Sequence, residues 1–283
     1  MLYEAYIDDS LTGDGQSLVG SIGCLVATSG QWVEFETRWR EAMCAGGASG
    51  RVFHMTDVLA GRGEFQDFTT AEQKNNLVRA LVRVLVDSDI RLGFCSSVSV
   101  REYDESYEEF PEFKPRSIYQ MNLQRTMRAV IEGVQPTADN PVVFFIETDQ
   151  RVEAHAVAVF YANIREMGWE RILPTITPLP KGPIPLQAAD LLAWEGSTHA
   201  SRHRFGTTPR PARGSYAALR DLPNFEFYII SKQGMMNAIA GTAIKSSHAA
   251  NNPAWKAARR RDQEFGMELM RRERGPSAKK GKK

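Results

Sequence analysis

The sequence has little cysteine and no long hydrophobic run. Its three cysteines among 283 residues are far apart and lack Cys-x-x-Cys spacing, so we expect neither a disulfide framework nor a thiolate zinc site. No apolar run approaches the roughly 20 residues of a membrane helix, and the N-terminus lacks the basic and apolar regions of a secretory signal. These absences predict a cytoplasmic protein that does not bind a membrane.

A strong overall charge is also absent, but the charge is unevenly distributed. The chain has a net charge of +1, yet residues 256–283 contain eleven Lys and Arg against four acids, which leaves about −6 for the rest. Such a basic segment attracts nucleic-acid phosphates. It is equally compatible with a solvated tail, or with contact to a neighbouring subunit in a homodimer. Arg259 and Arg260 are its candidate contacts to DNA or RNA.

Composition and length predict one globular domain with additions. Hydrophobic residues make up 42% of the chain and charged residues 24%, which is typical of globular proteins. We expect residues 1–250 to form one domain, with an acid-rich loop or lid inserted at about 101–116. Residues 251–283 should form a basic tail, helical at first and then disordered.

Hydrophobic periodicity predicts an α/β fold with a sheet of mixed direction. Its first three strands form an antiparallel meander, and helices then alternate with further strands. The strands of the meander are predicted at 2–8, 18–28 and 31–39. Later strands are predicted at 90–100, 140–149, 171–180 and 225–231, and helices at 71–88, 117–133, 151–168 and 184–203.

Asp190 lies in a predicted helix that has no polar face. Between Ile184 and Trp194 the only polar side chains are Gln187 and Asp190, so this helix should be buried. A lone buried carboxylate costs on the order of several kcal/mol unless a cation pairs with it or it takes up a proton. Gln187, three residues earlier on the same face, can hydrogen-bond Asp190 but cannot neutralise it. Asp190 therefore needs a partner, either a metal ion or a buried arginine.

Acids also follow two apolar strands. In "VVFFIETD" (142–149) side chains alternate, so Glu147 and Asp149 continue one face, although Asp149 is also suited to cap the next helix. In "YIDDS" (6–10), Asp8 and Asp9 point to opposite faces, so at most one of them can face the same site as Glu147 and Asp190.

Three carboxylates from two strand ends and a helix favour a divalent metal site. Mg²⁺ and Mn²⁺ bind one or two carboxylates, keep several waters and leave room for phosphate oxygens. Two such ions about 3.5–4 Å apart can activate a water and stabilise the leaving oxygen of a phosphodiester. The chain has no Gly-rich phosphate loop and no well-placed nucleophilic Ser or Cys, so other phosphate chemistry has less support.

Several motifs resemble the family called domain of unknown function 3800 (DUF3800). They are "YIDDS", the aromatic region with Trp32, Phe35 and Trp39, "FHMTDV" at 53–58 and "PLQAADLLAW" at 185–194. The resemblance covers about residues 3–232 and implies a ribonuclease H-like fold with metal-dependent nuclease chemistry. Leu11 departs from the pattern, because the family often has glycine there.

Carried over to this chain, the resemblance implies metal-binding and catalytic roles for Asp8, Glu147 and Asp190. Asp149 remains an alternative to Glu147. The residues to which we assign supporting roles are Asp9, Ser10, Asp57, Asp149 and Gln187.

Histidine and arginine residues complete the candidate site. His54 is the fourth candidate catalytic residue, because beside the acids it can move a proton; His54 and Asp57 can equally form a local cap. His199 and His203 have the spacing of a zinc helix but lack its glutamate and a third ligand, so no zinc site is predicted. The candidate phosphate contacts near Asp190 are Arg202, Arg204, Arg210 and Arg213, which are also compatible with a solvated loop.

The leading hypothesis is a Mg²⁺- or Mn²⁺-dependent nuclease acting on DNA or RNA. One alternative is a noncatalytic nucleic-acid-binding or protein-binding module with the same fold. Another is a structural subunit in which Asp190 pairs with a buried arginine.

Overall fold

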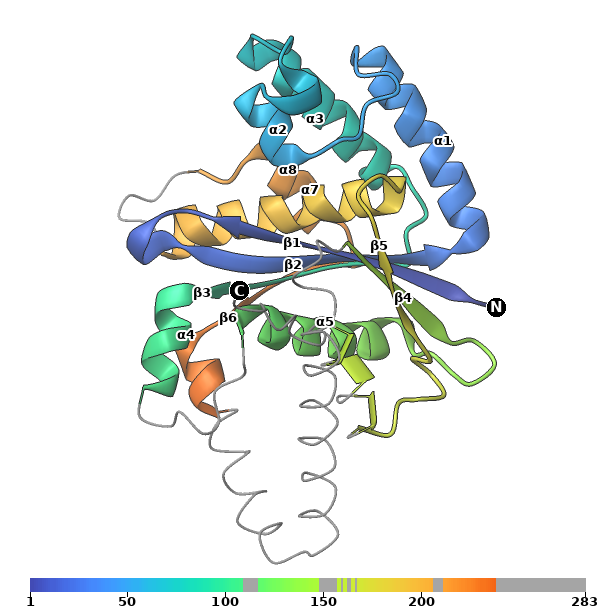
Figure 1. Cartoon of the computed structure of the whole chain (residues 1–283), viewed down its shortest axis with the longest axis vertical. Helices are drawn as coiled ribbons and strands as arrows, with labels where there is room; N and C mark the ends of the chain where they lie inside the picture. Colours follow the sequence, from blue (N-terminus) through green and yellow to red (C-terminus); the bar gives the residue numbers. More distant parts are fainter. Residues whose placement is uncertain are drawn as a thin grey trace, which may run out of the picture. The chain divides into compact units, whose positions relative to one another are not determined.

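The computed structural model describes residues 1–108, 117–147, 157–158, 160–161, 164–165, 167–205 and 211–237. The chain divides into two compact units, Met1–Met235 and Met236–Lys283. The first unit is an α/β fold in which helices flank both faces of a six-stranded sheet (Figure 1). The predicted boundary near residue 250 and the basic tail lie outside the described residues.

The sheet has mixed strand directions, as predicted. Its order is β5-β4-β1-β2-β3-β6. The pairs β1–β2 and β2–β3 are antiparallel, whereas β4 is parallel to β1, β5 to β4 and β6 to β3. The strands are β1 (Tyr3–Thr12), β2 (Val19–Thr28), β3 (Leu92–Ser99), β4 (Val142–Glu147), β5 (Ile176–Leu179) and β6 (Phe225–Ile230).

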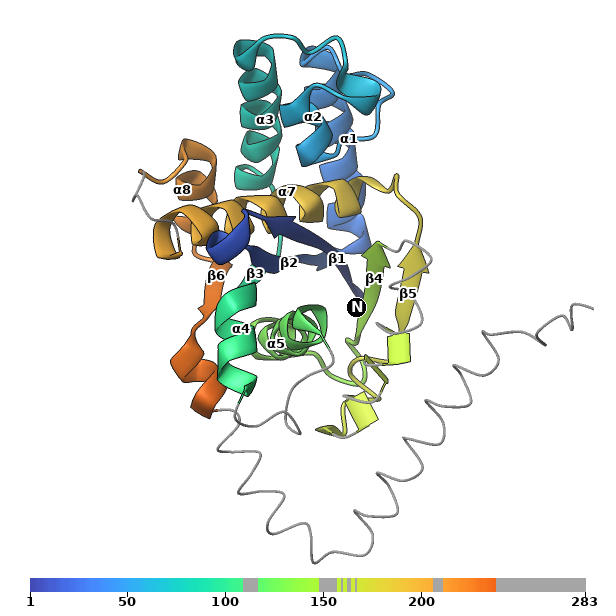
Figure 2. The ribbon, with the colours of Figure 1, turned by 60° about the vertical axis from the view of Figure 1, so that its left-hand side comes forward.

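Two helical layers cover the sheet and enclose two hydrophobic cores (Figures 1 and 2). One layer contains α1 (Ser29–Ala45), α2 (Met55–Ala60), α3 (Ala71–Val86), α7 (Ile184–His199) and α8 (Gly214–Arg220). The other contains α4 (Val100–Tyr107) and α5 (Ile118–Val134). None of the helices in the described part of the chain combines the length and apolar character needed to span a bilayer.

The prediction of a strand at residues 31–39 is wrong, because this segment belongs to α1. Trp32, Phe35 and Trp39 are three and four residues apart and form one buried helical face, whereas Val33 is exposed. Thr28 caps the helix, since its side chain accepts a hydrogen bond from the backbone N–H of Gln31. Aromatic residues are also common in strands, which explains the error. The third strand of the antiparallel set is β3.

The prediction that the first strand ends at Asp8 is also wrong. β1 continues to Thr12, because β2 pairs with it along its whole length, from Tyr3 opposite Thr28 to Thr12 opposite Val19. Asp8 therefore lies inside a strand and has a fixed backbone. The parallel pairing with β4, in contrast, ends one residue before Asp8, so Asp8 lies where the neighbouring strand stops.

Residues 101–107, predicted as part of an acidic loop or lid, belong instead to the short helix α4, which begins at Val100. Ser99 caps this helix by accepting a hydrogen bond from the backbone N–H of Glu102, and Tyr103 and Tyr107 form its buried face. The rest of the predicted loop, at 109–116, lies outside the described residues, as does most of the predicted helix at 151–168.

Helix α7 is buried from Pro185 to Thr198, as its lack of a polar face predicted. Gly23 on β2 permits its close approach to the sheet. A Cβ atom at Gly23 would lie 2.5 Å from the carbonyl oxygen of Ala189 and 2.6 Å from the nitrogen of Ala193. Because Gly23 pairs with Asp8 of β1, this contact also brings α7 next to Asp8.

Replacing Gly23 by alanine should therefore destabilise the protein. The methyl group would push α7 away from β2, at a cost of roughly 1–3 kcal/mol for overpacking. Chemical denaturation measures this change. Gly30→Ala in α1 is the matched control, because a Cβ atom at Gly30 would have no neighbour within 4 Å and alanine favours a helix. Equal stability of Gly23→Ala and the wild type would contradict the close-packing argument.

Candidate functional site

Three acids from three elements share the side of the sheet that α7 covers. In the parallel register of β1 and β4, Tyr6 lies beside Phe145 and their rings stack 4.8 Å apart. Because side chains alternate along a strand, Asp8 and Glu147 continue this face two residues further on. α7 adds Asp190. The structure thus places the three predicted metal-binding acids in one site, which we call the carboxylate site.

The acids of the carboxylate site are withdrawn from water and repel one another. Asp8 is 7% exposed, Asp190 4% and the side chain of Glu147 14%. Burial raises the pKa of Asp8 well above its usual range, and the charges of Asp190, Glu147 and Asp9 raise it further. The hydrogen bond from the backbone N–H of Asp9 to Oδ1 of Asp8, at 2.8 Å, lowers the pKa of Asp8.

Burial also raises the pKa of Asp190, while His54 and the backbone N–H of Met55 lower it. The charge of Glu147 then adds to the increase, and that of Lys181 opposes it. Asp8 and Asp190 are therefore hard to ionise, chiefly because they are buried and, to a smaller extent, because neighbouring acids repel their charge.

Lys181 is a cation of the site that the sequence reasoning missed. It lies in the loop between β5 and α7, and its Nζ is 3.2 Å from Oε1 of Glu147. Burial alone would lower the pKa of Lys181, but the charges of the three acids outweigh it and raise the pKa. The loop is held by a 2.6 Å hydrogen bond from Nε2 of Gln187 to the carbonyl oxygen of Gly182. The side chain of Lys181 is nevertheless 59% exposed.

The predicted hydrogen bond between Gln187 and Asp190 is replaced by bonds to another segment. Oε1 of Gln187 accepts from the backbone N–H of Phe53 at 3.0 Å. Oδ2 of Asp190 accepts from the backbone N–H of Met55 at 2.6 Å. Gln187 and Asp190 of α7 thus bind Phe53 and Met55, on either side of His54, and hold this segment in place.

His54 lies between two carboxylates. Its Nε2 is 3.7 Å from Oδ1 of Asp190, and its Nδ1 is 3.5 Å from Oδ2 of Asp57. Within the described part of the chain, the buried Nδ1 has no hydrogen-bond partner. Asp57 is held in place by Nε of Arg62 at 2.6 Å. A histidine in this position can take a proton from the site and pass it outward.

The supporting residues of the first strand occupy different surroundings. Asp9 is exposed on the opposite face of β1, toward α5. Tyr119 of α5 has a raised pKa, because it is buried and because the charges of Asp9 and Asp8 act on it. Ser10 and Ser197 of α7 form a hydrogen bond of 3.3 Å between their hydroxyl groups. Asp9 therefore lies apart from the carboxylate site, and Ser10 links β1 to α7.

The candidate phosphate contacts are only partly described. Arg213 lies with Nε 3.5 Å from Oε1 of Glu195 and with its guanidinium 4.8 Å from the centre of the Trp194 ring. Arg202 is exposed. Their phosphate-binding role stays a prediction. Asp149, Arg210, Arg259, Arg260 and the side chain of Arg204 lie outside the described residues.

His199 and His203 lie in a stack and do not converge on a common point. Their ring centres are 4.4 Å apart, and His199 also stacks on Tyr216 at 3.7 Å. Burial, followed by the charges of His203 and Arg220, lowers the pKa of His199 to about 4. His199 is therefore neutral near pH 7 and part of the packing.

The raised pKa values predict that metal-free protein loses stability as the pH rises. A group whose pKa is raised on folding binds more protons in the folded state. The stabilisation that it provides is therefore lost as the pH rises from its pKa in the unfolded state to its pKa in the folded state. For Asp190 this window runs from 3.8 to about 6 and represents on the order of 3 kcal/mol. Denaturation of wild type and Asp190→Asn in chelator, between pH 4 and 8, should show the wild type losing stability relative to the variant. If the stabilities of the two proteins changed in parallel with pH, the raised pKa of Asp190 would be contradicted.

Comparison with known proteins does not assign a family or a function to this site. Among the described residues, no group of three or more His, Cys, Asp or Glu side chains forms a metal-binding cluster as the side chains lie. No protein-family model matches the chain, and no curated protein matches it. The resemblance to DUF3800 therefore remains an interpretation of the sequence motifs.

Proposed function

We propose that this chain is a Mg²⁺- or Mn²⁺-dependent nuclease with a ribonuclease H-like fold. The observation that supports this function is the carboxylate site. Its three acids are buried or nearly buried, burial and the charge of Glu147 raise the pKa of both Asp8 and Asp190, and Lys181 and His54 offset this only in part. Buried carboxylates are costly without cations, and a divalent ion supplies the missing positive charge.

The chemistry of the donor set fits such ions. Asp8, Glu147 and Asp190 offer only oxygen ligands, which Mg²⁺ and Mn²⁺ prefer. Lys181 lies 3.2 Å from Oε1 of Glu147, and His54 lies 3.7 Å from Oδ1 of Asp190, so both are close to the carboxylates that would bind the ions. Binding requires Lys181 to leave Glu147, and its exposed side chain allows that movement.

The residues around the acids have distinct roles in this proposal. Asp8, Glu147 and Asp190 would hold the ions, which would supply activation of a water and stabilisation of the leaving oxygen of a phosphodiester. The backbone N–H of Met55 holds Oδ2 of Asp190 and leaves Oδ1 on the side of His54. His54 accepts a proton and passes it toward Asp57. Lys181, once released from Glu147, contacts a substrate phosphate.

Nucleic acid is the proposed substrate class. The support for it lies in the sequence, where residues 256–283 contain eleven Lys and Arg against four acids, because basic segments bind phosphate backbones. Arg202, which is exposed just after the helix that carries Asp190, is a further candidate phosphate contact.

Cleavage of labelled DNA and RNA in Mn²⁺ tests the proposal. Asp190→Asn and Glu147→Gln should each lower the rate by about 100-fold, which corresponds to roughly 3 kcal/mol of transition-state stabilisation. Asp221→Asn is a control, because Asp221 is an exposed acid paired with Arg220. Equal cleavage by all four proteins would rule out the carboxylate site as the catalyst. Salt-sensitive binding without cleavage, retained in Asp190→Asn, would identify a noncatalytic binding module.

A further inference from the structure

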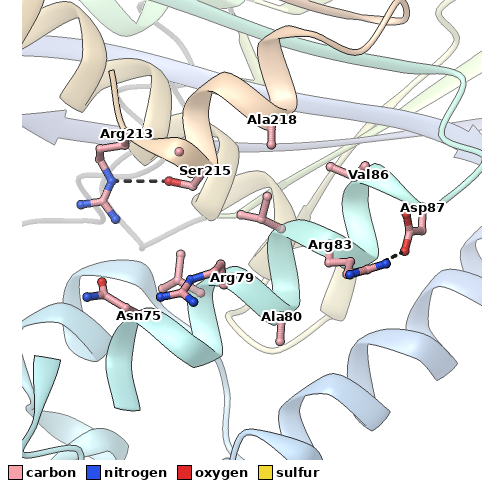
Figure 3. A pocket seen from close by; sticks show the side chains of 12 residues that line it. Asn75, Arg79, Ala80, Arg83, Val86, Asp87, Arg213, Ser215 and Ala218 are labelled. Atoms are coloured by element: carbon pink, nitrogen blue, oxygen red, sulfur yellow. Dashed lines mark hydrogen bonds and ion pairs between the residues drawn. The ribbon is translucent and has the colours of Figure 1, made fainter. Parts of the chain in front are cut away.

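A groove of about 860 Å³ runs between α3 and the beginning of α8 (Figure 3). It is distinct from the carboxylate site, because none of the three acids lines it. The side chains of Asn75 and Asp87 mark its two ends on α3, twelve residues apart, which is about 18 Å along a helix. Its apolar lining consists of Val78, Ala80, Val82, Val86 and Ala218.

The groove carries an excess of positive charge. Its described lining contains three arginines, Arg79, Arg83 and Arg213, and one acid, Asp87. Asp87 accepts from Nε of Arg83 at 3.3 Å. Arg79 is exposed on α3 and makes no hydrogen bond or ion pair with the described residues. The charge of Arg79 is thus uncompensated beside an apolar surface.

Arg213 is held in a fixed position on the opposite side of the groove. Its Nε lies 3.5 Å from Oγ of Ser215 and 3.5 Å from Oε1 of Glu195, which is completely buried. Ser215 donates to the same Glu195 oxygen at 2.6 Å, and the guanidinium lies over the ring of Trp194. These contacts use Nε and one face of the guanidinium, so the terminal nitrogens are available to a ligand. Figure 3 shows Arg213 projecting from the α8 side toward α3.

We propose that this groove binds a small organic anion. Its apolar body would lie on the valine surface, and its oxyanion head would bind Arg79 and Arg213. The volume lies within the roughly 300–1,000 Å³ of small-molecule sites, and guanidinium groups bind planar oxyanions through two hydrogen bonds. No aromatic side chain is among the described lining residues, so the groove lacks the stacking surfaces of single-strand nucleic-acid sites.

The test uses 8-anilinonaphthalene-1-sulfonate, an aromatic sulfonate whose fluorescence reports binding. The wild type should bind it saturably, and Arg79→Ala should weaken binding about tenfold through loss of a charge-assisted hydrogen bond. Ala218→Trp, at an exposed position of α8, should abolish binding by filling the groove. Arg128→Ala removes an exposed arginine from α5, in the other helical layer, and should leave binding unchanged.

Four results would overturn the proposal. Absent binding, or equal binding by all these proteins, would exclude the groove as the site. Equally tight binding of the neutral analogue N-phenyl-1-naphthylamine would show that charge has no part in recognition. Displacement of the sulfonate by a single-stranded oligonucleotide would assign the groove to nucleic acid. Asp8→Asn should bind the probe normally, so this outcome is independent of the proposed nuclease activity.

Discussion

Replacing Asp8 by asparagine is expected to abolish nuclease activity, whereas replacing Asp9 should only reduce it. The two acids are neighbours on β1 but face opposite sides of the sheet. Burial and then the charges of Asp190 and Glu147 raise the pKa of Asp8, while Asp9 is exposed on the side of α5. A loss of at least about 100-fold is expected for Asp8→Asn, because a proposed metal ligand loses its charge. Single-turnover cleavage measures both rates.

The same substitution should make the metal-free protein more stable. Asparagine removes a buried charge that Asp190 and Glu147 repel, so Asp8→Asn should gain on the order of 1 kcal/mol at pH 7.5, or about 2–4 °C in Tm. Asp9→Asn should show no comparable gain. Mn²⁺ should stabilise the wild type and Asp9→Asn more than Asp8→Asn. A destabilised Asp8→Asn protein, or equal activity of the two variants, would contradict the assigned role of Asp8.

Replacing Lys181 by methionine is expected to strengthen Mn²⁺ binding. In the metal-free site the ammonium group lies 3.2 Å from Glu147 and competes with an incoming ion for the same carboxylate. Without it, the three acids repel one another more strongly, so Lys181→Met should be less stable in chelator. The Mn²⁺-dependent increase in Tm should be larger than for the wild type, because ligand binding stabilises the folded state. Electron paramagnetic resonance of free Mn²⁺ gives the dissociation constant directly.

Lys232→Met provides the matched control for this substitution. Lys232 has a similar exposure and pairs with Glu105 at 2.9 Å, but it follows β6, which lies at the opposite edge of the sheet from β5 and β4. Removing such a surface pair changes stability by about 0–1 kcal/mol and should not affect Mn²⁺ binding. If Lys181→Met and Lys232→Met bound Mn²⁺ equally, competition between Lys181 and the metal would be disproved.

Site residues whose position follows from the pattern of a single helix or strand could be predicted from the sequence. Asp190 was identified because a helix with no polar face must be buried, and the structure buries it. Glu147 followed from alternation along one strand. The strand predicted at 31–39 failed because Trp32, Phe35 and Trp39 are compatible with either type of element, and tertiary packing decides between them.

Contacts between distant segments could not be predicted in this way. Gln187 binds Phe53, which is 134 residues earlier in the chain, and the hydrophobic pattern of one helix says nothing about that partner. Lys181 reaches Glu147 because β5 lies beside β4, and a single sequence does not give the strand order. Glu195 was missed because a lone glutamate near a helix end normally faces water.

The close contact between α7 and β2 also determines which parts of the site can move. Gly23, and Gly196 against Cys95, leave no space between helix and sheet, so α7 can open only together with the strands below it. Helix α7, which carries Asp190, therefore moves little on the time scale of catalysis. The side chain of Lys181, in contrast, is exposed and extends from the loop before α7. In this site the negative charges are fixed and the positive charge is the adjustable part.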